Sequence, residues 1–358
     1  MKPPTQGRKG AQIPFVRIGW AVVLVLVATA AIPRHEAAAP ATNYHLLKKV
    51  VLGGEGSWDY LIADSVGRRV YISRGTHVMV VDADSYAVVG DIPGTEGVHG
   101  IALAREFHRG FTSNGRANAV TIFDLATLKT LGTAPVGNGP DAIIYDPASK
   151  RVFTFNGHGG DATAIDAATG ATAGSVPLGG KPEFAVADGH GHIYNNLEDK
   201  SELVEIDSHQ LSVTARWPLA PCEEPSGIAM DTAHARLFIG CHNQMMAVVD
   251  AHTGKVVATP AIGQGVDANA FDPGTQLAFS SNGDGTLTVV HEDSPDKFSV
   301  AANVSTQRGA RTMAIDLKTH NIFLVTADFG PPPAATPEHP HPRAAALPGS
   351  FTLLVFGP

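Results

Sequence analysis

The sequence predicts an all-β protein built from repeated four-stranded units, and three observations lead to that prediction. Gly and Pro number 38 and 25 of 358 residues without a collagen period, so the chain is rich in turns. Short apolar runs rich in Val, Ile, Phe and Thr recur along it. These runs repeat about every 42 residues, which is the period of one blade of a β-propeller. Charged residues, at 17%, are too few for a coiled coil.

The first 30 residues predict an export signal. Four Lys and Arg residues and no acidic residue precede an apolar stretch over 18–32, and residues 28–30 (Ala-Thr-Ala) fit a cleavage site. A membrane span needs about 20 apolar residues, so we expect a cleaved signal rather than an uncleaved anchor, and no membrane span in the mature chain. Residues 31–43 are expected to be a flexible lead. The mature protein is predicted to be periplasmic or secreted.

The seven units can be aligned on one position at the end of their predicted first strand. In chain order these positions are Asp64, Ala104, Asp146, Asp188, Asp231, Asp272 and Asp316. Each unit holds four strand-like runs, which in the fifth unit cover 227–231, 236–241, 246–250 and 255–262. Four strands in about 42 residues predict one propeller blade per unit.

The two ends of the chain are predicted to complete one blade together. The seventh unit ends with its third run, 351–356, and an unassigned strand lies at 44–52. Pairing these segments closes a ring and removes an exposed sheet edge. The sequence therefore predicts a single seven-bladed β-propeller over residues 44–358, closed by the N-terminal strand in the last blade.

Polar residues that end the second and third strands are predicted to stabilise turns, because Asn and Asp readily bond turn backbone. The second-strand set is Asn114, Asn156, Asn196 and Asn282. The third-strand set is Asp82, Asp124, Asp166, Asp207 and Asp250, and the sixth unit departs from it with His291.

The ends of the second runs carry a family resemblance. They read Tyr-Ile-Ser-Arg at 71–74, Phe-Thr-Ser-Asn at 111–114, Phe-Thr-Phe-Asn at 153–156 and Phe-Ser-Ser-Asn at 279–282. This pattern resembles the Tyr-Val-Thr-Asn repeat of exported YVTN-repeat, or YncE-like, propellers, and Gly-Pro-Asp-Ala at 139–142 strengthens the match. The resemblance covers 44–358. It implies a seven-bladed, WD40-like propeller that serves as a periplasmic or surface binding or scaffold protein, without a shared catalytic motif.

Seven equivalent positions lie five residues before the first-strand anchors, and all are polar. They are Asp59, His99, Asp141, Glu183, Ser226, Asp267 and Arg311. Because the first strand of a blade lines the central channel, we expect these side chains at one channel mouth. Converging carboxylates raise one another's pKa or recruit a cation. Two interpretations stay open: a ligand or metal pocket, or a polar mouth whose side chains point into channel water.

Residues 328–350 form a Pro-rich insertion between the second and third strands of the seventh unit, with seven prolines. Such a segment cannot pack a core and is predicted to lie extended over the face that carries the ring. Glu338, His339 and His341 are candidate ligands for a divalent cation, with His99 below. The other interpretation is a mobile or partner-binding segment that gates the pocket.

The only two cysteines, Cys222 and Cys241, fall on the same face of the fifth unit. In an oxidising compartment they are predicted to form a disulfide, which would stabilise the fold by about 3 kcal/mol. Two free thiols are the alternative.

The function predicted from these features is binding rather than catalysis. No Ser/His/Asp spacing, phosphate-binding Gly loop or haem-attachment motif is present in the sequence. We expect a monomeric exported propeller that binds a protein, glycan or small molecule at the channel face, without a cofactor other than a possible divalent cation. The alternative is a lactonase-like propeller hydrolase, in which Glu183 or His99 activates water and Arg311 stabilises an oxyanion. A net charge of −8 argues against nucleic acid as partner.

Overall fold

The computed structural model describes residues 42–334 and 344–358, together with seven scattered residues among the first 14. Nearly all of the predicted export signal and lead lies outside the described residues, as do Glu338, His339 and His341. Within the described part of the chain, no helix is long and apolar enough to cross a membrane.

The described residues confirm an all-β fold of antiparallel sheets, with no α-helix among them and two short 3₁₀ turns, η1 (Arg105–Phe107) and η2 (Glu198–Lys200). Four sheets have four strands each in chain order. These strands are β9 (Pro140–Asp146), β10 (Arg151–Asn156), β11 (Asp161–Asp166) and β12 (Thr172–Pro177); β13 (Pro182–Ala187), β14 (His192–Leu197), β15 (Glu202–Asp207) and β16 (Ser212–Pro218); β17 (Pro225–Asp231), β18 (Arg236–Cys241), β19 (Met245–Asp250) and β20 (Val256–Ala258); and β21 (Val266–Asp272), β22 (Leu277–Asn282), β23 (Thr286–Ser294) and β24 (Lys297–Ser305).

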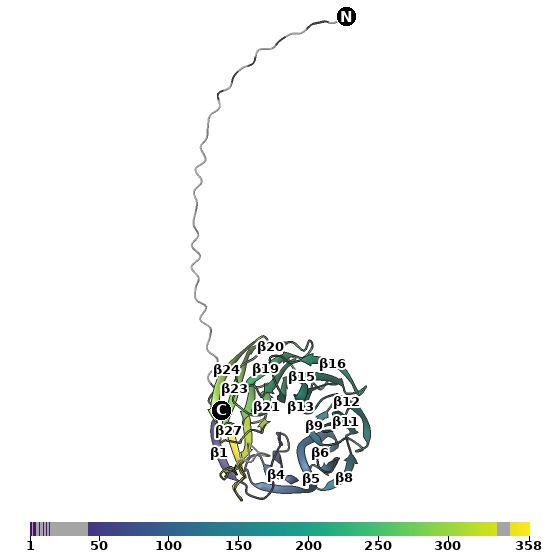
Figure 1. Cartoon of the computed structure of the whole chain (residues 1–358), viewed down its shortest axis with the longest axis vertical. Coiled ribbons are helices and arrows are strands. Elements are labelled where there is room, and N and C mark those ends of the chain that lie inside the picture. The colour runs from purple at the N-terminus through teal and green to yellow at the C-terminus, as the bar shows by residue number, and fades with distance from the viewer. Residues whose placement is uncertain are drawn as a thin grey trace. The chain divides into compact units, whose positions relative to one another are not determined.

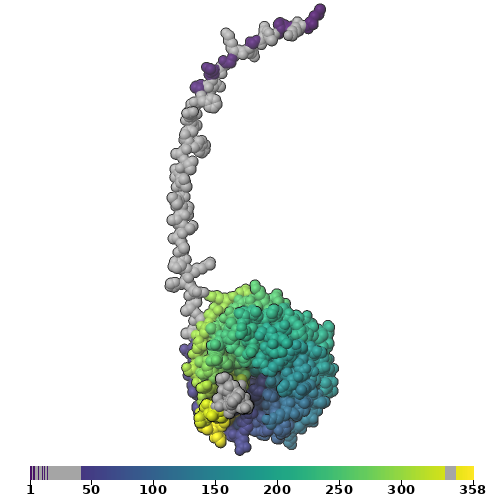
Figure 2. All heavy atoms as spheres, viewed as in Figure 1, coloured from purple at the N-terminus to yellow at the C-terminus, as the bar shows by residue number. Residues whose placement is uncertain are grey.

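A fifth four-stranded sheet combines the two ends of the described chain. Its order is β1 (His45–Val51), β27 (Thr352–Gly357), β26 (Asn321–Thr326) and β25 (Met313–Asp316). In the β1–β27 ladder, Lys49 pairs with Leu354 and Val51 with Thr352. Figure 2 shows the same proximity on the molecular surface, where purple and yellow atoms adjoin.

The remaining sheet has seven strands because one long strand belongs to two ladders. Its strands are β2 (Leu61–Asp64), β3 (Arg69–Ser73), β4 (Gly75–Asp82), β5 (Val88–Ala104), β6 (Arg109–Asn114), β7 (Ala119–Asp124) and β8 (Thr130–Pro135). The first half of β5 pairs with β4, as at Ile92 and Val78, and its second half pairs with β6, as at Ile101 and Thr112. Thus β5 is an outer strand for one group of four and an inner strand for the next.

The first strand of each group lies nearest the centre of the fold. In Figure 1, β9, β13 and β21 surround the centre, whereas β16, β20 and β24 lie at the outer edge. Each inner strand contacts the next one along the chain, from β5 and β9 through β13, β17 and β21 to β25, and β25 contacts β2. The starts of all inner strands therefore lie on one face and their ends on the other.

The hydrophobic core lies between neighbouring sheets. Phe153 and Phe155 of β10, for example, pack in one cluster with Val204 and Ile206 of β15. Middle strands such as β18 are buried along their whole length, because a sheet covers each of their faces. Outer strands such as β12 are mostly exposed. This layering explains the short, nearly continuous apolar runs in the sequence.

The turn role predicted for the third-strand Asp set is confirmed. Asp82 Oδ1 accepts the Ser85 backbone N–H at 2.7 Å, and this hydrogen bond lowers the pKa of Asp82. Asp124 accepts the Thr127 N–H in the same way, also at 2.7 Å.

The turn role predicted for the second-strand Asn set was wrong, because Asn114, Asn156 and Asn282 donate to side chains of the adjacent strand and Asn196 donates to the Ser226 carbonyl of the next inner strand. Asn114 Nδ2 donates to Thr121 Oγ1 at 2.8 Å, and Asn282 Nδ2 donates to Thr286 and Thr288. These amides are buried inside the sheet, where Thr hydroxyls of the adjacent strand are nearer than the turn backbone.

The predicted fourth strand of the fifth unit, 255–262, was too long. β20 covers only Val256–Ala258, and pairing resumes in a single bridge between Met245 and Ala261. Pro260 lies in between and has no N–H to donate to the ladder.

Candidate functional site

The seven predicted ring residues lie at the starts of the inner strands, on one face of the fold. Five lie within β5, β9, β13, β17 and β21, and two come just before β2 and β25. In chain order the set is Asp59, His99, Asp141, Glu183, Ser226, Asp267 and Arg311. The contacts among these side chains divide the set into three groups.

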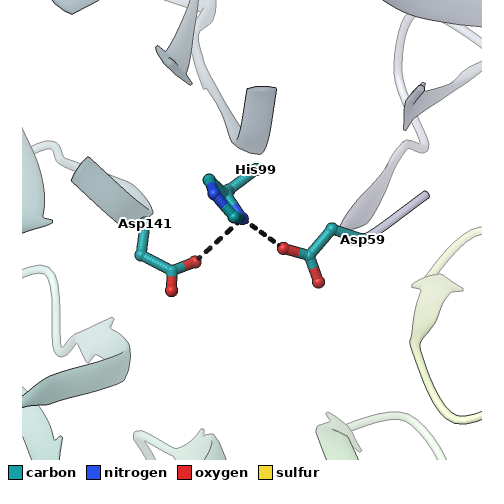
Figure 3. Close-up of side chains that lie close together, drawn as sticks. All are labelled: Asp59, His99 and Asp141. Atoms are coloured by element: carbon teal, nitrogen blue, oxygen red, sulfur yellow. Dashed lines mark hydrogen bonds and ion pairs between the residues drawn. The ribbon is translucent and has the colours of Figure 1, made fainter. Parts of the chain in front are cut away.

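The first group is Asp59, His99 and Asp141, which point toward one another from neighbouring inner strands (Figure 3). His99 Nδ1 forms a hydrogen bond with Asp59 Oδ2 at 2.5 Å and lies 3.6 Å from Asp141 Oδ1. The hydrogen bond to Asp59 raises the pKa of His99, and the charge of Asp141 adds to that effect. All three side chains are between about a quarter and two-fifths exposed, at 28, 38 and 26%.

The second group is the ion pair of Asp267 and Arg311. Arg311 Nη1 donates to Asp267 Oδ1 at 2.8 Å. Burial raises the pKa of Asp267 to about 7, although Arg311 opposes the shift; Asp59 and Asp141 add to it. Ser226 lies beside this pair, but its hydroxyl donates to the backbone oxygen of Asp267 at 3.1 Å. Ser226 therefore joins two inner strands.

The third group centres on Glu183. Lys181 Nζ lies 2.8 Å from Glu183 Oε1 and also pairs with Glu198. Burial raises the pKa of Glu183, the charge of Asp141 adds to the effect, and Lys181 opposes it. Sequence reasoning missed Lys181 and Glu198. Lys181 was detectable, because it lies two residues before Glu183 in the same entry loop.

Two aromatic residues that the sequence analysis did not select lie directly after ring positions. The rings of Tyr60 and Phe184 are 4.4 Å apart between centroids. The Tyr60 hydroxyl is buried and has no hydrogen-bond partner among the described residues. Burial raises its pKa well above the usual value, and Asp141, Glu183, Asp59 and Asp267 all add to the shift. The charges of all four ring carboxylates therefore act on the Tyr60 hydroxyl.

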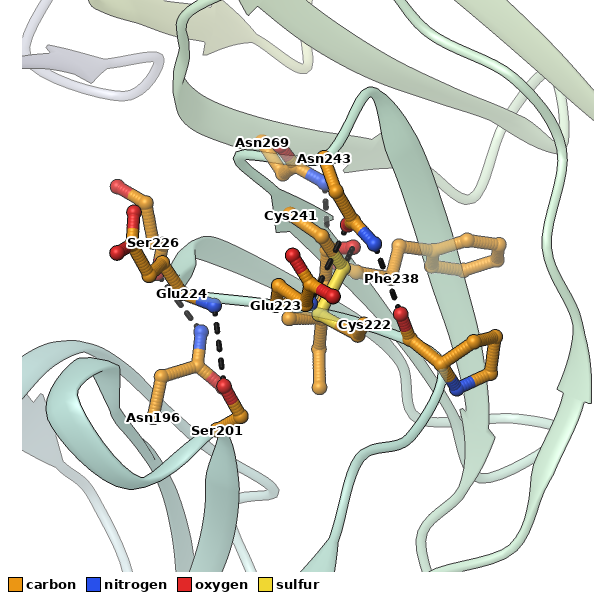
Figure 4. Close-up of a disulfide and its surroundings, with 12 residues drawn as sticks. Asn196, Ser201, Cys222, Glu223, Glu224, Ser226, Phe238, Cys241, Asn243 and Asn269 are labelled. Atoms are coloured by element: carbon orange, nitrogen blue, oxygen red, sulfur yellow. Dashed lines mark hydrogen bonds between the residues drawn. A yellow bond between two sulfur atoms is a disulfide. The ribbon is translucent and has the colours of Figure 1, made fainter.

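The two cysteines are bonded to each other near Ser226 (Figure 4). Cys222 lies in the segment that leads into β17, and Cys241 ends β18. Asn243 holds the same segment, since it donates to the Pro221 carbonyl at 2.8 Å and accepts the Glu223 N–H at 3.2 Å. The disulfide and these bonds fix the entry to this inner strand.

The described parts of the Pro-rich segment, residues 328–334 and 344–350, lie beside the ring. The Leu347 N–H donates to the Asp328 carbonyl at 2.7 Å, which brings these two parts together. The Phe329 ring lies 6.2 Å from the ring of Trp58, the residue before Asp59. Trp58 and Leu347 line a pocket of about 490 Å³. The base of the segment is therefore adjacent to the ring.

The charges of the site favour a positively charged group. Four ring carboxyls face two protein cations, Arg311 and Lys181, in addition to His99. Burial raises the pKa of Asp141 to about 6, with Asp59 adding to the shift and His99 opposing it. Asp59, His99 and Asp141 also place three metal-ligating atoms within 4.8 Å of one another. However, His99 Nδ1 is already engaged in a hydrogen bond.

Comparisons with known proteins identify the fold type. No protein-family model and no curated protein matches the sequence. The structure is similar to the RRP9 WD40 repeats (10% identity, TM-score 0.71, covering 89% of this chain and 99% of that chain). It is also similar to a chain of the mitotic checkpoint complex (13%, 0.70, 94% and 99%) and to Kuenenia stuttgartiensis hydrazine synthase (13%, 0.65, 81% and 95%). At these identities the likeness shows the fold alone, which is of the WD40, β-propeller type.

Proposed function

We propose that this chain is an exported, non-enzymatic, seven-bladed β-propeller of the YVTN-repeat, YncE-like type, and that it binds a ligand through a cationic group, an ammonium or guanidinium, at the ring. The observation that carries the proposal is the convergence of Asp59, Asp141, Glu183 and Asp267, which lie at the starts of four inner strands on one face of the fold.

The double role of β5 supports the proposed count of seven blades. Its first half completes the group β2–β4, and its second half begins the group that continues with β6–β8. Those two blades and the five four-stranded sheets give seven. The pairing of β1 with β27 and the contact of β25 with β2 support a closed ring.

The electrostatics of the ring favour an incoming cation over an anion. The pKa values of Asp141 and Asp267, raised to about 6 and about 7, mean that ionising these buried carboxyls is unfavourable. A cation bound among them offsets that cost by direct attraction. Tyr60 and Phe184, whose rings contact each other, come directly after Asp59 and Glu183, and aromatic faces are favourable neighbours of ammonium groups.

The sequence and the disulfide support export. A charged, apolar and small-residue succession over the first 30 residues is typical of an export signal. Disulfides persist in oxidising compartments such as the periplasm, and Cys222 is bonded to Cys241.

The contacts of the ring do not favour the hydrolase alternative. A lactonase-like site needs a base and an oxyanion donor that both face the substrate. Arg311, the predicted oxyanion donor, is instead paired with Asp267, and Glu183, a predicted base, is paired with Lys181.

Calorimetric titration of the purified protein with spermidine, cadaverine, arginine amide and neutral sugars tests the proposal. We expect the cationic compounds to bind and the sugars not to bind. The triple variant Asp141→Asn, Glu183→Gln and Asp267→Asn should lose that binding, because it removes three ring charges with little change of shape.

The matched control carries the same loss of charge at exposed positions: Asp91→Asn, Glu96→Gln and Glu223→Gln. It should bind like the unmodified protein. Equal binding by the ring triple, or no binding of any cationic compound, contradicts the ring assignment. Turnover of a lactone panel that the ring triple abolishes would establish the hydrolase instead.

A further inference from the structure

A second cluster of carboxylates and histidine lies at the opposite ends of the inner strands from the ring. Asp231 is the last residue of β17, His234 lies in the turn before β18, and Glu292 comes from β23 of the next sheet. His234 Nδ1 lies 2.6 Å from Asp231 Oδ2 and 3.1 Å from Glu292 Oε1. The ligating atoms of all three residues lie within 4.8 Å of one another.

The carboxyl group of Glu292 is buried and receives no hydrogen bond in regular geometry. It is 1% exposed, and neither carboxyl oxygen accepts a hydrogen bond from a described residue. His234 Nδ1 has no partner in hydrogen-bond geometry either, despite the short distances. Leaving a carboxylate unsatisfied in the interior is costly, and the nearby carboxylate of Asp231, itself 4% exposed, adds to the cost. Burial first, and then the charge of Asp231, raise the pKa of Glu292, and His234 opposes the shift.

In three other repeats, a small residue stands at the position of Glu292. The equivalent residue, directly after the third-strand Asp, is buried Ala83, Ala167 or Ala251 in three other repeats. The backbone is the same in each case: the N–H of this residue donates to a carbonyl in the turn between the first two strands. For Ala251 the acceptor is Ala235 at 3.0 Å, and for Glu292 it is Gln276 at 2.9 Å.

His234 also replaces a different residue type. The equivalent positions, three residues after the first-strand Asp, include Ser149, Thr275 and Thr319. Their hydroxyls donate to the Asp of their own repeat, as Thr319 does to Asp316 at 2.7 Å. In the fifth repeat an imidazole nitrogen stands where the hydroxyl would cap Asp231. Two substitutions of the repeat thus create the cluster.

At other junctions a basic side chain from the next repeat contacts the first-strand Asp. His320 Nδ1 lies 2.6 Å from Asp272, and Arg68 Nη1 lies 2.6 Å from Asp316. The residue equivalent to His320 and Arg68 beside Asp231 is Gln276, which is neutral and exposed. The junction between the β17–β20 and β21–β24 sheets therefore has an additional buried carboxylate in place of a basic side chain.

Arg236 positions the two halves of the cluster. Its guanidinium donates to the His234 carbonyl at 3.1 Å and to Asp250 at 2.8 Å, both in its own sheet. It also donates to the Pro295 carbonyl at 2.7 Å and to Asp296 at 3.0 Å, in the hairpin that follows Glu292. These bonds hold the His234 turn against the Glu292 hairpin.

From these observations we propose that Asp231, His234 and Glu292 bind a divalent first-row metal ion of the Zn²⁺ type, which joins two neighbouring sheets. One imidazole and two carboxylates are a donor set that Zn²⁺ accepts, and metal bonds of about 2.0–2.2 Å let one ion reach all three atoms. Asp231 is oriented for this role, because its Oδ1 accepts the Ala233 N–H at 3.0 Å and leaves Oδ2 toward His234. His234, at 35% exposure, leaves a path for entry.

The test uses the purified protein after chelator treatment, titrated with ZnCl₂ by calorimetry and with CoCl₂ by absorption spectroscopy. We expect one Zn²⁺ per chain, a higher melting temperature with Zn²⁺, and visible Co²⁺ bands of a site with nitrogen and oxygen ligands. Glu292→Ala and His234→Thr restore residues found in the other repeats, so both variants should fold. Each should weaken Zn²⁺ by about 100-fold or more, since even indirect partners of a metal contribute about 10–100-fold.

Two controls separate this site from other zinc-binding groups. His192→Thr with Glu205→Ala removes another His–carboxylate pair, whose Nδ1–Oε1 distance is 2.7 Å, and should leave Zn²⁺ binding unchanged. The ring triple variant should also bind one Zn²⁺ at the Asp231 cluster. If the unmodified protein binds no Zn²⁺, or if Glu292→Ala binds it as tightly, the cluster holds a shared proton and the proposal is overturned.

Discussion

The two Asp–His–carboxylate clusters contain the same chemical groups at opposite ends of the inner strands, yet their surroundings differ. In the ring, His99 forms a hydrogen bond with Asp59, and its three members are partly exposed. In the second cluster, Glu292 is 1% exposed and His234 Nδ1 has no hydrogen-bond geometry to either carboxylate. Similar composition therefore does not imply similar chemistry.

The difference follows from how each cluster is supported. Asp267–Arg311 and Glu183–Lys181 pairs accompany the ring carboxyls and compensate part of their charge. Arg236 contacts the hairpin that follows Glu292, and its guanidinium is engaged with Asp250 and Asp296. A partly exposed, partly neutralised cluster suits a ligand that binds reversibly, whereas a buried cluster with little charge compensation suits a resident metal ion.

The Arg236→Ala substitution should have the largest effect on the second cluster and on stability. In Arg236→Ala, a nearly buried guanidinium that bridges two sheets is lost and Asp250 is left without its partner, so we expect a loss of about 3–5 kcal/mol in the free energy of unfolding. Urea denaturation measures this loss. Zn²⁺ binding should weaken as well, while amine binding at the ring persists in the folded fraction.

Arg308→Ala is the matched control, because Arg308 is exposed and its removal should change stability by no more than about 0.5 kcal/mol. A loss below about 1 kcal/mol for Arg236→Ala would contradict the bridging role assigned to the buried guanidinium.

The pH dependence of stability should separate the two clusters. The pKa of Asp267 is raised to about 7, and that of Glu292 is also raised to about 7. Both carboxyls bind a proton in the folded state that the unfolded chain releases between about pH 4 and 7, so the free energy of unfolding should fall as pH rises through that range. Asp267→Asn and Glu292→Gln should each reduce this fall, by on the order of 1–2 kcal/mol.

Addition of Zn²⁺ should distinguish the contributions of Glu292 and Asp267 to the pH dependence of stability. A bound cation stabilises ionised Glu292, so saturating ZnCl₂ should remove the Glu292 contribution and leave that of Asp267, which Arg311, Asp59 and Asp141 surround. Urea titrations at about pH 5 and about pH 8, with and without ZnCl₂, measure these changes. A decrease of stability on acidification that Asp267→Asn abolishes would contradict the direction assigned to its pKa.

The sequence predicted the repeat and the ring positions, because both depend on a spacing that is visible in one dimension. It did not predict the second cluster. Asp231 was recognised as a strand end, and His291 as a departure from the pattern, but the role of Glu292 depends on the neighbouring sheet. Lys181 and Tyr60 were missed for a related reason: their significance lies in side-chain contacts across strands, which spacing does not specify. The available signal was the residue type at a repeated position: Glu292 stands where three other repeats have Ala.

Tyr60→Phe should have the smallest effect and tests how the ring tolerates an unpaired group. The Tyr60 hydroxyl is buried without a partner among the described residues. A neutral hydroxyl costs less to leave unpaired than a carboxylate, and its removal should stabilise the protein by up to about 1 kcal/mol. Tyr44→Phe is the control of opposite sign, because the Tyr44 hydroxyl donates to the His320 carbonyl at 2.7 Å and its loss should cost about 1 kcal/mol. If Tyr60→Phe also destabilises the protein by that amount, then the Tyr60 hydroxyl has a partner in solution, such as a water molecule among the ring carboxyls.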